Sequence, residues 1–439
     1  MFSVANNTNI NVKSHIIWIM NHYANMPCNG PSLRHFYFAK WLKAYGWTPI
    51  VFASNVLHLN NKEIVITKGK YEYKVEQSEK IPFVYVKTSP YRGNGLSRIR
   101  NMFSFFINLL LMSKSFAQAY GKPDIILASS VHPLTCVAGI ILARKFSVPC
   151  IAEIRDLWPE AIFAYGKLKD TSLLGRVLLC GEKWIYKNAD AIIFTKEGDV
   201  NYIREKHWDS EQGGPIDIDK CFYINNGVDL AKFVNDVKEN KLDDPDLLDV
   251  KAFNVVYAGA IRPVNNVELL IDTAKIILKE DPSIKFLIYG DGTDRERLEK
   301  RARSEGITNV YFKGFVEKKY IPYILSKSSV NILNYSQSKF NWARGNSSNK
   351  LFEYMASGKP IISTVKMGYC ILTRYNCGFS TERNDADALA DTILKVKNLP
   401  REEYERMARN ASAGAKDFDF QQLTQKLIEV IDYAESKSK

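Results

Sequence analysis

Short apolar runs that alternate with helical patterns are the feature of this 439-residue chain that most limits its fold. The runs lack the polar alternation of a strand with one wet face, so they predict parallel strands covered on both sides. Helical patterns fall between them, notably at 32–45 and 134–146. This order is typical of a doubly wound α/β sheet. The runs in the first half are 15–20, 48–53, 124–128, 149–154 and 191–195.

A polar stretch at 236–249 interrupts the pattern, which then starts again. The second set of runs predicts a second domain of the same kind, so we expect an α/β fold of two Rossmann-like domains. Ligands of such sheets bind beyond the carboxyl ends of the strands, and two sheets facing each other would hold substrates in the cleft between them. The runs in the second half are 253–258, 285–289, 310–312, 330–333 and 360–363.

The predicted domain boundaries follow from these segments. An N-terminal domain spans 1–235, a linker spans 236–251 and a C-terminal domain spans 252–415. Residues 416–439 form a helix that could pack back on the N-terminal domain. With 46% apolar residues, the chain is long enough to give each domain its own core.

Composition argues against several classes of protein. No stretch reaches the roughly 18 to 20 apolar residues that a membrane-spanning helix needs, and the polar start lacks the regions of a signal peptide. We therefore expect a cytoplasmic location. The seven cysteines are scattered and include no Cys-x-x-Cys pair. This spacing indicates neither a disulfide framework nor a zinc site, and we expect no metal.

The positive charge is concentrated in the first third of the chain. Residues 1–150 hold 17 Lys and Arg against 5 Asp and Glu, whereas residues 151–439 hold 43 of each kind. Within this third, 91–114 combines arginines, aromatics and leucines without one acidic residue, the composition of an interfacial helix. We expect it to contact the anionic inner leaflet, unless it packs on the sheet. No nucleic-acid-binding module accompanies the charge, so nucleic acid is not an expected partner.

The segment 347–360 predicts a short helix with an anion site at its start. Ser347 or Ser348 can cap the first turn, and Gly358 ends the helix before an apolar run. Backbone N–H groups and Lys350 would stabilise a diphosphate there, and Glu353, one turn in, could accept hydrogen bonds from two vicinal hydroxyls. An ordinary amphipathic helix would show the same pattern.

Six segments in their order carry a resemblance to a known family. They are Asn-Gly-Pro-Ser-Leu-Arg at 29–34, Arg-Asp-Leu-Trp-Pro-Glu at 155–160, Asn-Gly-Val-Asp at 226–229, Gly-Asp-Gly at 290–292, Gly-Phe-Val at 314–316, and the helix at 347–360. Over nearly its full length the chain resembles retaining GT-B glycosyltransferases of family 4. Within that family it looks most like the branch that builds bacterial capsule and O-antigen polysaccharides.

The resemblance implies an activity and its partners. The C-terminal domain would bind a nucleotide sugar, with UDP as the expected nucleotide, and the N-terminal domain would bind a polyprenyl-linked glycan acceptor at the inner membrane. A hexose, with deoxy and acetamido sugars included, would move with retention and without a cofactor or metal. Two alternatives stay open: a UDP-sugar epimerase of similar build, and a non-catalytic nucleotide-sugar-binding subunit.

The resemblance also assigns donor-binding residues. It implies that Glu353 holds the ribose and that the backbone after the third strand of the domain contacts the base. Gly30 would let the first loop approach the phosphates, although Gly30 and Gly290 could equally serve simple turns. The full set expected to bind the donor is Gly30, Gly290, Phe315, Val316, Ser347, Ser348, Asn349 and Glu353.

The chain departs from the family pattern at three positions. Gly345 stands where the family has its first glutamate, which leaves Arg344, Asn346 or Ser347 to contact the hexose. The two cations that usually hold the diphosphate fall at Ala260 and Asn265. We expect Arg262 and Lys350 to replace them as the catalytic cations. Arg155 and Asp156, in a motif familiar in this branch, complete the predicted catalytic set, although they could instead be a pair that fixes a loop.

Overall fold

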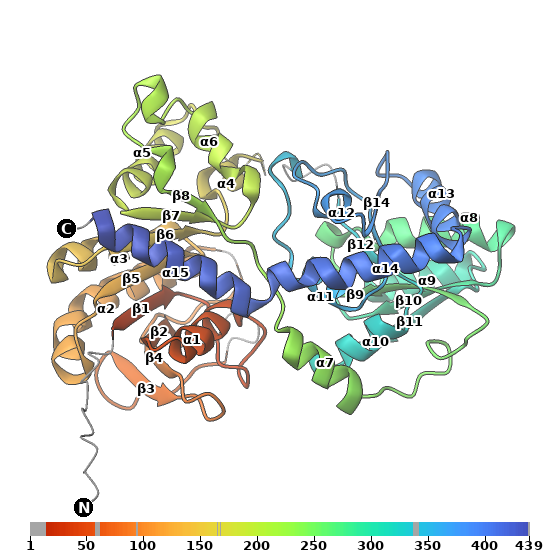
Figure 1. Ribbon diagram of the computed structural model, residues 1–439, viewed down its shortest axis with the longest axis horizontal. Helices are drawn as coiled ribbons and strands as arrows, with labels where there is room; N and C mark the ends of the chain where they lie inside the picture. The colour runs from red at the N-terminus through yellow and green to blue at the C-terminus, as the bar shows by residue number, and fades with distance from the viewer. Residues whose placement is uncertain are drawn as a thin grey trace, which may run out of the picture. The chain divides into compact units, whose positions relative to one another are not determined.

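The computed structural model describes residues 15–57, 62–93, 95–164, 166, 168–336 and 342–437 (Figure 1). The chain divides into two compact units. This division does not test the predicted boundaries at 235 and 251, which stay a prediction. Unit 1 is Met1–Glu153, Asn188–Ile192 and Val430–Lys439, and unit 2 is Ile154–Lys187 and Ile193–Glu429.

An eight-stranded sheet forms in the first half of the chain, in the order β3-β4-β2-β1-β5-β6-β7-β8. β1 pairs in parallel with β2 and β5, and β4 is parallel to β2 and antiparallel to β3. All five runs predicted in this half are strands. The strands are β1 (Ile16–Asn21), β2 (Thr48–Ser54), β3 (Tyr71–Val75), β4 (Pro82–Val86), β5 (Ile125–Ser130), β6 (Cys150–Ile154), β7 (Ala191–Phe194) and β8 (Cys221–Tyr223).

Helices follow most of these strands, as a doubly wound sheet requires. α3 packs closely on β5, because a Cβ at Gly139 would lie 2.4 Å from the Cβ of Ala128. The helices are α1 (Arg34–Ala44), α2 (Leu96–Tyr120), α3 (Pro133–Phe146), α4 (Trp158–Ala164), α5 (Leu173–Asn188), α6 (Val200–Glu205) and α7 (Leu230–Glu239).

The second half forms a six-stranded sheet in the order β11-β10-β9-β12-β13-β14, and all its pairings are parallel. Alternate side chains of β9 enter two different cores: Val255 and Tyr257 on one face, Val256 and Ala258 on the other. Both faces are therefore covered by helices. The strands are β9 (Phe253–Ala258), β10 (Ile284–Tyr289), β11 (Val310–Gly314), β12 (Val330–Leu333), β13 (Ile361–Ser363) and β14 (Gly378–Ser380).

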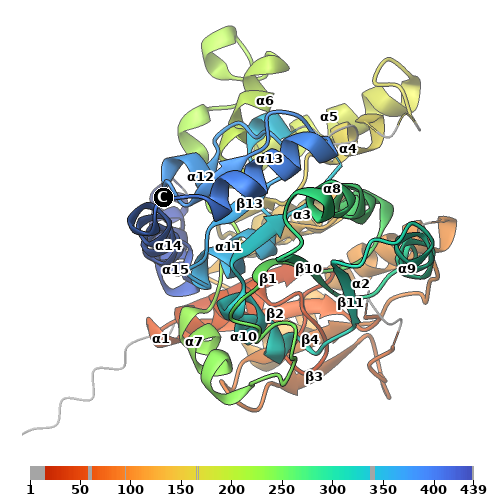
Figure 2. The ribbon, with the colours of Figure 1, turned by 90° about the vertical axis from the view of Figure 1, so that its right-hand side faces the viewer.

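The helices of this half divide between the two faces (Figure 2). α8 and α13 pack together over one face, while α7, α10, α11 and α14 cover the other. The predicted doubly wound fold is thus confirmed. The helices are α8 (Val267–Glu280), α9 (Arg295–Ser304), α10 (Ile321–Lys327), α11 (Asn349–Ala356), α12 (Ile371–Arg374), α13 (Ala386–Lys397), α14 (Arg401–Ala415) and α15 (Phe420–Lys437).

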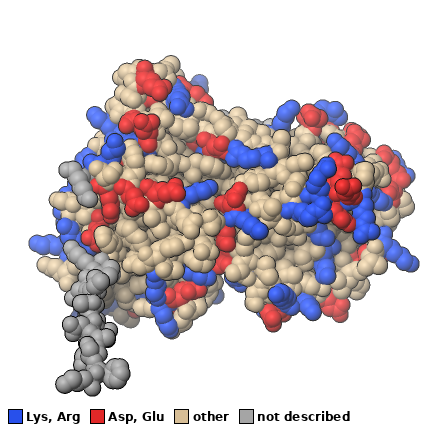
Figure 3. Space-filling model, viewed as in Figure 1, with Lys and Arg blue, Asp and Glu red and all other residues tan. Residues whose placement is uncertain are grey.

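Two features bear on the charge and membrane predictions. The surface of α14 carries paired charges such as Arg401 with Glu405, and Figure 3 shows acidic and basic side chains mixed over this part of the chain. In the part of the chain that the structure describes, no helix combines the length and the apolar character needed to cross a bilayer.

Candidate active site

The start of α11 lies at the carboxyl edge of the six-stranded sheet, because the helix connects β12 to β13. Ser348 is its N-cap residue, but the Ser348 side chain bonds to no N–H of the first turn and instead meets the Tyr335 hydroxyl at 2.5 Å. The Asn346 Oδ1 accepts from the backbone N–H of Ser348. Since no side chain caps the first turn, its remaining N–H groups can bind an anion. The predicted serine cap is absent.

Lys350 reaches from α11 to the end of the neighbouring strand β9. Its Nζ donates to the Tyr257 hydroxyl at 3.0 Å and lies 4.6 Å from the centre of that ring. A Cβ at Gly259 would come within 2.3 Å of the same Nζ. The ammonium therefore lies against the loop that follows β9. Burial lowers the pKa of Lys350 to about 8, against the opposing effect of Glu353.

Glycines hold the loops after β9 and β10 together. Gly290 has φ 141°, and a Cβ there would lie 1.9 Å from the carbonyl oxygen of Gly259. A Cβ at Gly292 would lie 2.2 Å from the Ile261 carbonyl oxygen. Gly290 thus has a demonstrable packing role, which is one of the two roles the sequence allowed. A side chain here would separate two loops at the carboxyl edge of the sheet.

Glu353 forms an ion pair with a lysine from another segment. Its Oε1 lies 2.7 Å from the Nζ of Lys318, and the carboxylate side chain is 20% exposed. The Glu353 charge raises the pKa of Lys318. Lys318 was missed by the sequence reasoning, because it is 35 residues away in the chain and belongs to no motif. A ribose that binds Glu353 through two hydroxyls would compete with this ammonium.

The loop after β11 presents the residues expected near the base. Phe315 is 73% exposed, and Val316 is half-buried. Gly314 has φ 76°, and the Arg295 guanidinium lies 3.2 Å from where a Gly314 Cβ would be. An exposed aromatic ring at a strand's carboxyl end is available for stacking on a flat ligand. Whether it contacts a base stays a prediction.

Asn265 and Arg262 are two further residues that the sequence analysis related to the cations of the diphosphate site. Asn265, where the family has a lysine, is buried and donates to the Ala260 carbonyl oxygen at 2.6 Å. It therefore fastens the loop after β9. Arg262, three residues earlier, is exposed on the same loop. The contacts of Lys350 thus fix the position of its ammonium. For Arg262 the structure establishes only that the residue lies on this loop.

The residues around Gly345 show which could replace the missing glutamate. Arg344 is buried, and its two terminal nitrogens pair with Glu160 and Glu205, whereas its Nε has no hydrogen-bond partner among the described residues. Asn346 is 6% exposed, and its Nδ2 has no hydrogen-bond partner among the described residues. Arg344 and Asn346 therefore each hold an unused donor, and the terminal nitrogens of Arg344 are already paired.

Arg155 and Asp156 lie after β6, and Asp156 is exposed. The Arg155 carbonyl oxygen accepts from the Thr195 hydroxyl at 3.1 Å. Close by in unit 2, Asp199 is buried, and neither of its carboxylate oxygens has a hydrogen-bond partner in the described chain. Burial raises the pKa of Asp199 to about 6, with smaller opposing effects of Lys196 and Arg344. Asp156 adds to the rise, so these acids share one electrostatic environment.

Unit 1 carries its own polar cluster after β1 and β5. Gly30, in the loop after β1, has φ 152°, and a Cβ there would lie 3.0 Å from Asn25. His132 Nε2 lies 2.8 Å from His22 Nδ1, and His22 Nε2 lies 2.7 Å from Asn101. Burial lowers the pKa of His132 to about 3, so it is neutral at physiological pH. His132, just before α3, is 1% exposed.

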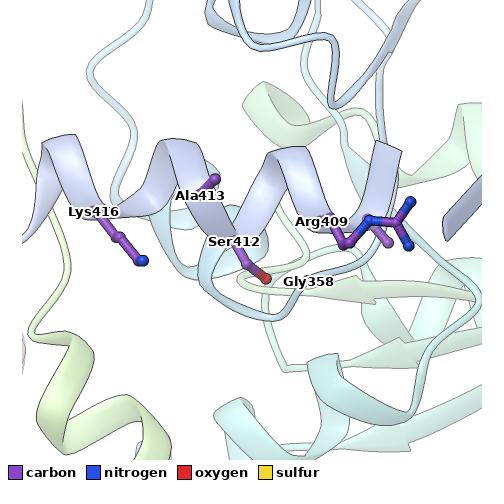
Figure 4. A pocket seen from close by; sticks show the side chains of 6 residues that line it. Gly358, Arg409, Ser412, Ala413 and Lys416 are labelled. Carbon is purple, nitrogen blue, oxygen red and sulfur yellow. The ribbon is translucent and has the colours of Figure 1, made fainter. Parts of the chain in front are cut away.

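A separate pocket lies at the other end of α11. It measures about 340 Å³ and is lined by Gly358 and by residues of α14, with Ser412 and Arg409 pointing along it (Figure 4). Neither Lys350 nor Glu353 lines this pocket. It is therefore distinct from the helix start described above.

Comparison with known families identifies both halves of the chain. Residues 30–213 match the family described as glycosyl transferase 4-like domain, and residues 239–413 match glycosyl transferases group 1. The chain is a glycosyltransferase of the GT-B type. The two matched segments contain Gly30 and the whole of α11.

Two relatives of this chain are themselves named as glycosyltransferases. It is 23% identical over 224 residues, 49% of its length, to the poly(ribitol-phosphate) alpha-N-acetylglucosaminyltransferase of Staphylococcus aureus (strain COL), and covers 39% of that longer protein. It is 24% identical over 326 residues to the putative colanic acid biosynthesis glycosyl transferase WcaI of Escherichia coli (strain K12), covering 71% of this chain and 75% of that one.

A solved structure with the same fold contains a nucleotide. The Anabaena protein HepE, in complex with UDP and glucose, is 16% identical, covers 95% of this chain and 99% of its own, and superposes with a TM-score of 0.63. At this identity the likeness establishes the fold.

Proposed function

We propose that this glycosyltransferase moves a hexosyl group from a UDP-linked sugar to a lipid-linked glycan in surface polysaccharide synthesis, with retention at the anomeric carbon. The observation that carries the proposal is the meeting of Lys350, the uncapped start of α11 and the glycine loop after β9. A diphosphate placed there would receive one ammonium and several backbone N–H groups. The HepE complex with UDP supports the choice of nucleotide.

The chemistry asked of the protein is electrostatic. The bond between the anomeric carbon and the β-phosphate oxygen breaks, and negative charge grows on the leaving diphosphate. Lys350, Arg262 and the N–H groups of α11 stabilise that charge. By family resemblance, the acceptor hydroxyl attacks from the face the diphosphate leaves and passes its proton to the departing phosphate oxygen. This route needs no protein base and no metal.

We assign recognition of the donor to residues at its nucleotide end and at its sugar end. Glu353 accepts hydrogen bonds from the ribose hydroxyls after Lys318 is displaced, and Phe315 and Val316 flank the base. Asn346 supplies a donor for an oxygen of the hexose. An acetamido carbonyl would accept from its Nδ2, and the name of the Staphylococcus aureus relative, an N-acetylglucosaminyltransferase, is consistent with such a sugar. We place Arg155 and Asp156 near the acceptor hydroxyl.

The acceptor is proposed to bind unit 1. A pocket of about 400 Å³ opens there, lined by Val56, Glu63, Pro90, Tyr91, Arg92 and Ser97, in and just before the start of α2 and in the segment after β2. The polar groups and the Tyr91 ring suit a glycan, and Arg92 suits the diphosphate to which that glycan is attached. An enzyme with this acceptor would work at the cytoplasmic face of the inner membrane.

One experiment separates the proposal from its alternatives. The protein is incubated with UDP- and GDP-linked sugars, with and without a polyprenyl-linked acceptor, and nucleotide release and sugar isomerisation are followed by chromatography. Acceptor-dependent UDP release supports transfer. Isomerisation without acceptor would identify an epimerase, and binding without turnover would identify a non-catalytic subunit. The anomeric configuration of the product tests retention, and full activity in EDTA tests metal independence.

A further inference from the structure

The long helix α2 has two apolar faces, of which one is covered. Its inner face, including Phe105 and Phe116, is buried against the rest of unit 1. The outer face carries large apolar side chains that recur every three or four residues and are 47% to 83% exposed. This outer stripe extends about 22 Å along the helix at 1.5 Å per residue. The outer stripe consists of Leu96, Ile99, Phe103, Ile107 and Leu111.

Exposed cations lie around the outer stripe. Arg100 and Lys114 are exposed on α2 itself, toward the two ends of the stripe. The carbonyl oxygen of Lys87 accepts from Asn108, and the Lys145 Nζ donates to Ser113 at 3.0 Å, so exposed lysines border both long edges of the stripe. α2 contains no acidic residue. The cationic rim thus consists of Lys87, Arg100, Lys114 and Lys145.

We propose that the outer stripe and its cationic rim dock unit 1 onto the surface of an anionic bilayer. The apolar side chains enter the boundary between headgroups and acyl chains, and the rim binds lipid phosphates. The arrangement matches such a surface because a bilayer of this kind offers apolar depth beneath a layer of negative charge. Monomeric proteins seldom expose an apolar stripe of this extent without a partner.

The geometry disfavours two other occupants. A second copy of the chain would bring identical cationic rims together across the contact, and like charges in register are unfavourable. A nucleic acid would match the rim but would leave five apolar side chains against a charged backbone. The proposal does not depend on which sugar is transferred, since docking needs no donor or acceptor.

The test uses sedimentation of the full chain with vesicles of phosphatidylcholine alone and with 30% phosphatidylglycerol. The structure predicts at least tenfold tighter binding to the anionic vesicles, lost progressively at higher salt. The triple variant Phe103→Ser, Ile107→Ser, Leu111→Ser should weaken binding at least tenfold. Since all three side chains are exposed, the thermal midpoint should be unchanged, and turnover with a short water-soluble acceptor should be retained.

A matched control variant replaces three exposed apolar residues outside unit 1: Val234→Ser, Leu248→Ser, Val250→Ser. It should bind like the unchanged protein. Equal binding to neutral and anionic vesicles, or equal loss in the control variant, would overturn the proposal. A mass measurement in solution in which the unchanged chain is a dimer and the triple serine variant a monomer would assign the stripe to a second copy instead. Transfer activity can fail without affecting any of these outcomes.

Discussion

At the scale of single residues, the site depends on side chains that the sequence could name but not place. Lys350 was expected at a diphosphate because it begins a helix, and the structure adds the contact with Tyr257 and the loop at Gly259. Lys318 could not be found from sequence, since no spacing rule connects a loop residue to a helix residue 35 positions later. Asn346 stands out only through its unpartnered, buried Nδ2.

Replacing Lys350 with methionine should lower kcat/KM for the nucleotide sugar by roughly 100-fold, because the leaving diphosphate loses one preorganised positive charge that stabilises it. Steady-state release of UDP measures the effect. Lys366→Met, at an exposed lysine paired with Glu382, is the matched control and should leave the rate unchanged. An equal rate for Lys350→Met would remove this residue from the catalytic set.

The pKa of Lys350 predicts an alkaline limb in the pH profile. Burial lowers this pKa to about 8, so the ammonium is charged below that pH and loses its proton above it. Because kcat/KM reports groups of the free enzyme, it should fall as pH rises through about 8. Arg stays charged throughout this range, so a folded and active Lys350→Arg variant should lack the limb. A limb that persists in that variant would assign it to another group.

At the scale of elements, the strands were the best predicted part. All ten expected apolar runs coincide with strands, because strands buried on both faces need continuous apolar sequence. The strands missed were β3, β4, β8 and β14. β3 has an exposed, polar character and pairs antiparallel at the sheet edge, so its sequence resembles a loop. The helix cap at Ser348 was predicted wrongly, because Tyr335 competes for the hydroxyl.

The glycine contact between the loops after β9 and β10 gives a prediction at this scale. Gly290→Ala would place a Cβ 1.9 Å from the Gly259 carbonyl oxygen at an unfavourable φ. We expect a loss of about 2 to 3 kcal/mol in the free energy of unfolding and a weaker affinity for UDP. Denaturant unfolding and calorimetric titration measure the two effects. Gly181→Ala, in α5 with open space around it, should be neutral or slightly stabilising.

At the scale of the whole molecule, folding stability should depend on pH through Asp199. Burial raises the pKa of this carboxyl from 3.8 to about 6 in the folded state. The folded protein therefore favours the protonated form, so its stabilising effect is full below about pH 4 and is lost as pH rises through 6. Above that, folding must bury a charge. The prediction of two doubly wound domains was correct because each of the two sheets has its own set of apolar runs in the sequence.

The variant Asp199→Asn tests this dependence. At pH 8 it should raise the free energy of unfolding by on the order of 2 kcal/mol, whereas near pH 4 the difference from the unchanged protein should vanish. Thermal unfolding across that range measures both. Asp156→Asn, at an exposed position, should show little change in stability. A constant difference at all pH values would mean that Asp199 is not titrating as described.

The pairing of Glu353 with Lys318 has a consequence for how an anionic donor approaches. A bare carboxylate one turn from Lys350 would repel an incoming diphosphate and cancel part of the attraction of that lysine. Lys318 offsets the charge of this carboxylate, so under the proposed function the donor would meet less repulsion as it approaches Lys350. Since Lys318 is 56% exposed, its bond to Glu353 is weak and opens at little cost once the ribose arrives. In the proposed function, Lys318 would thus act as an exchangeable counterion of Glu353.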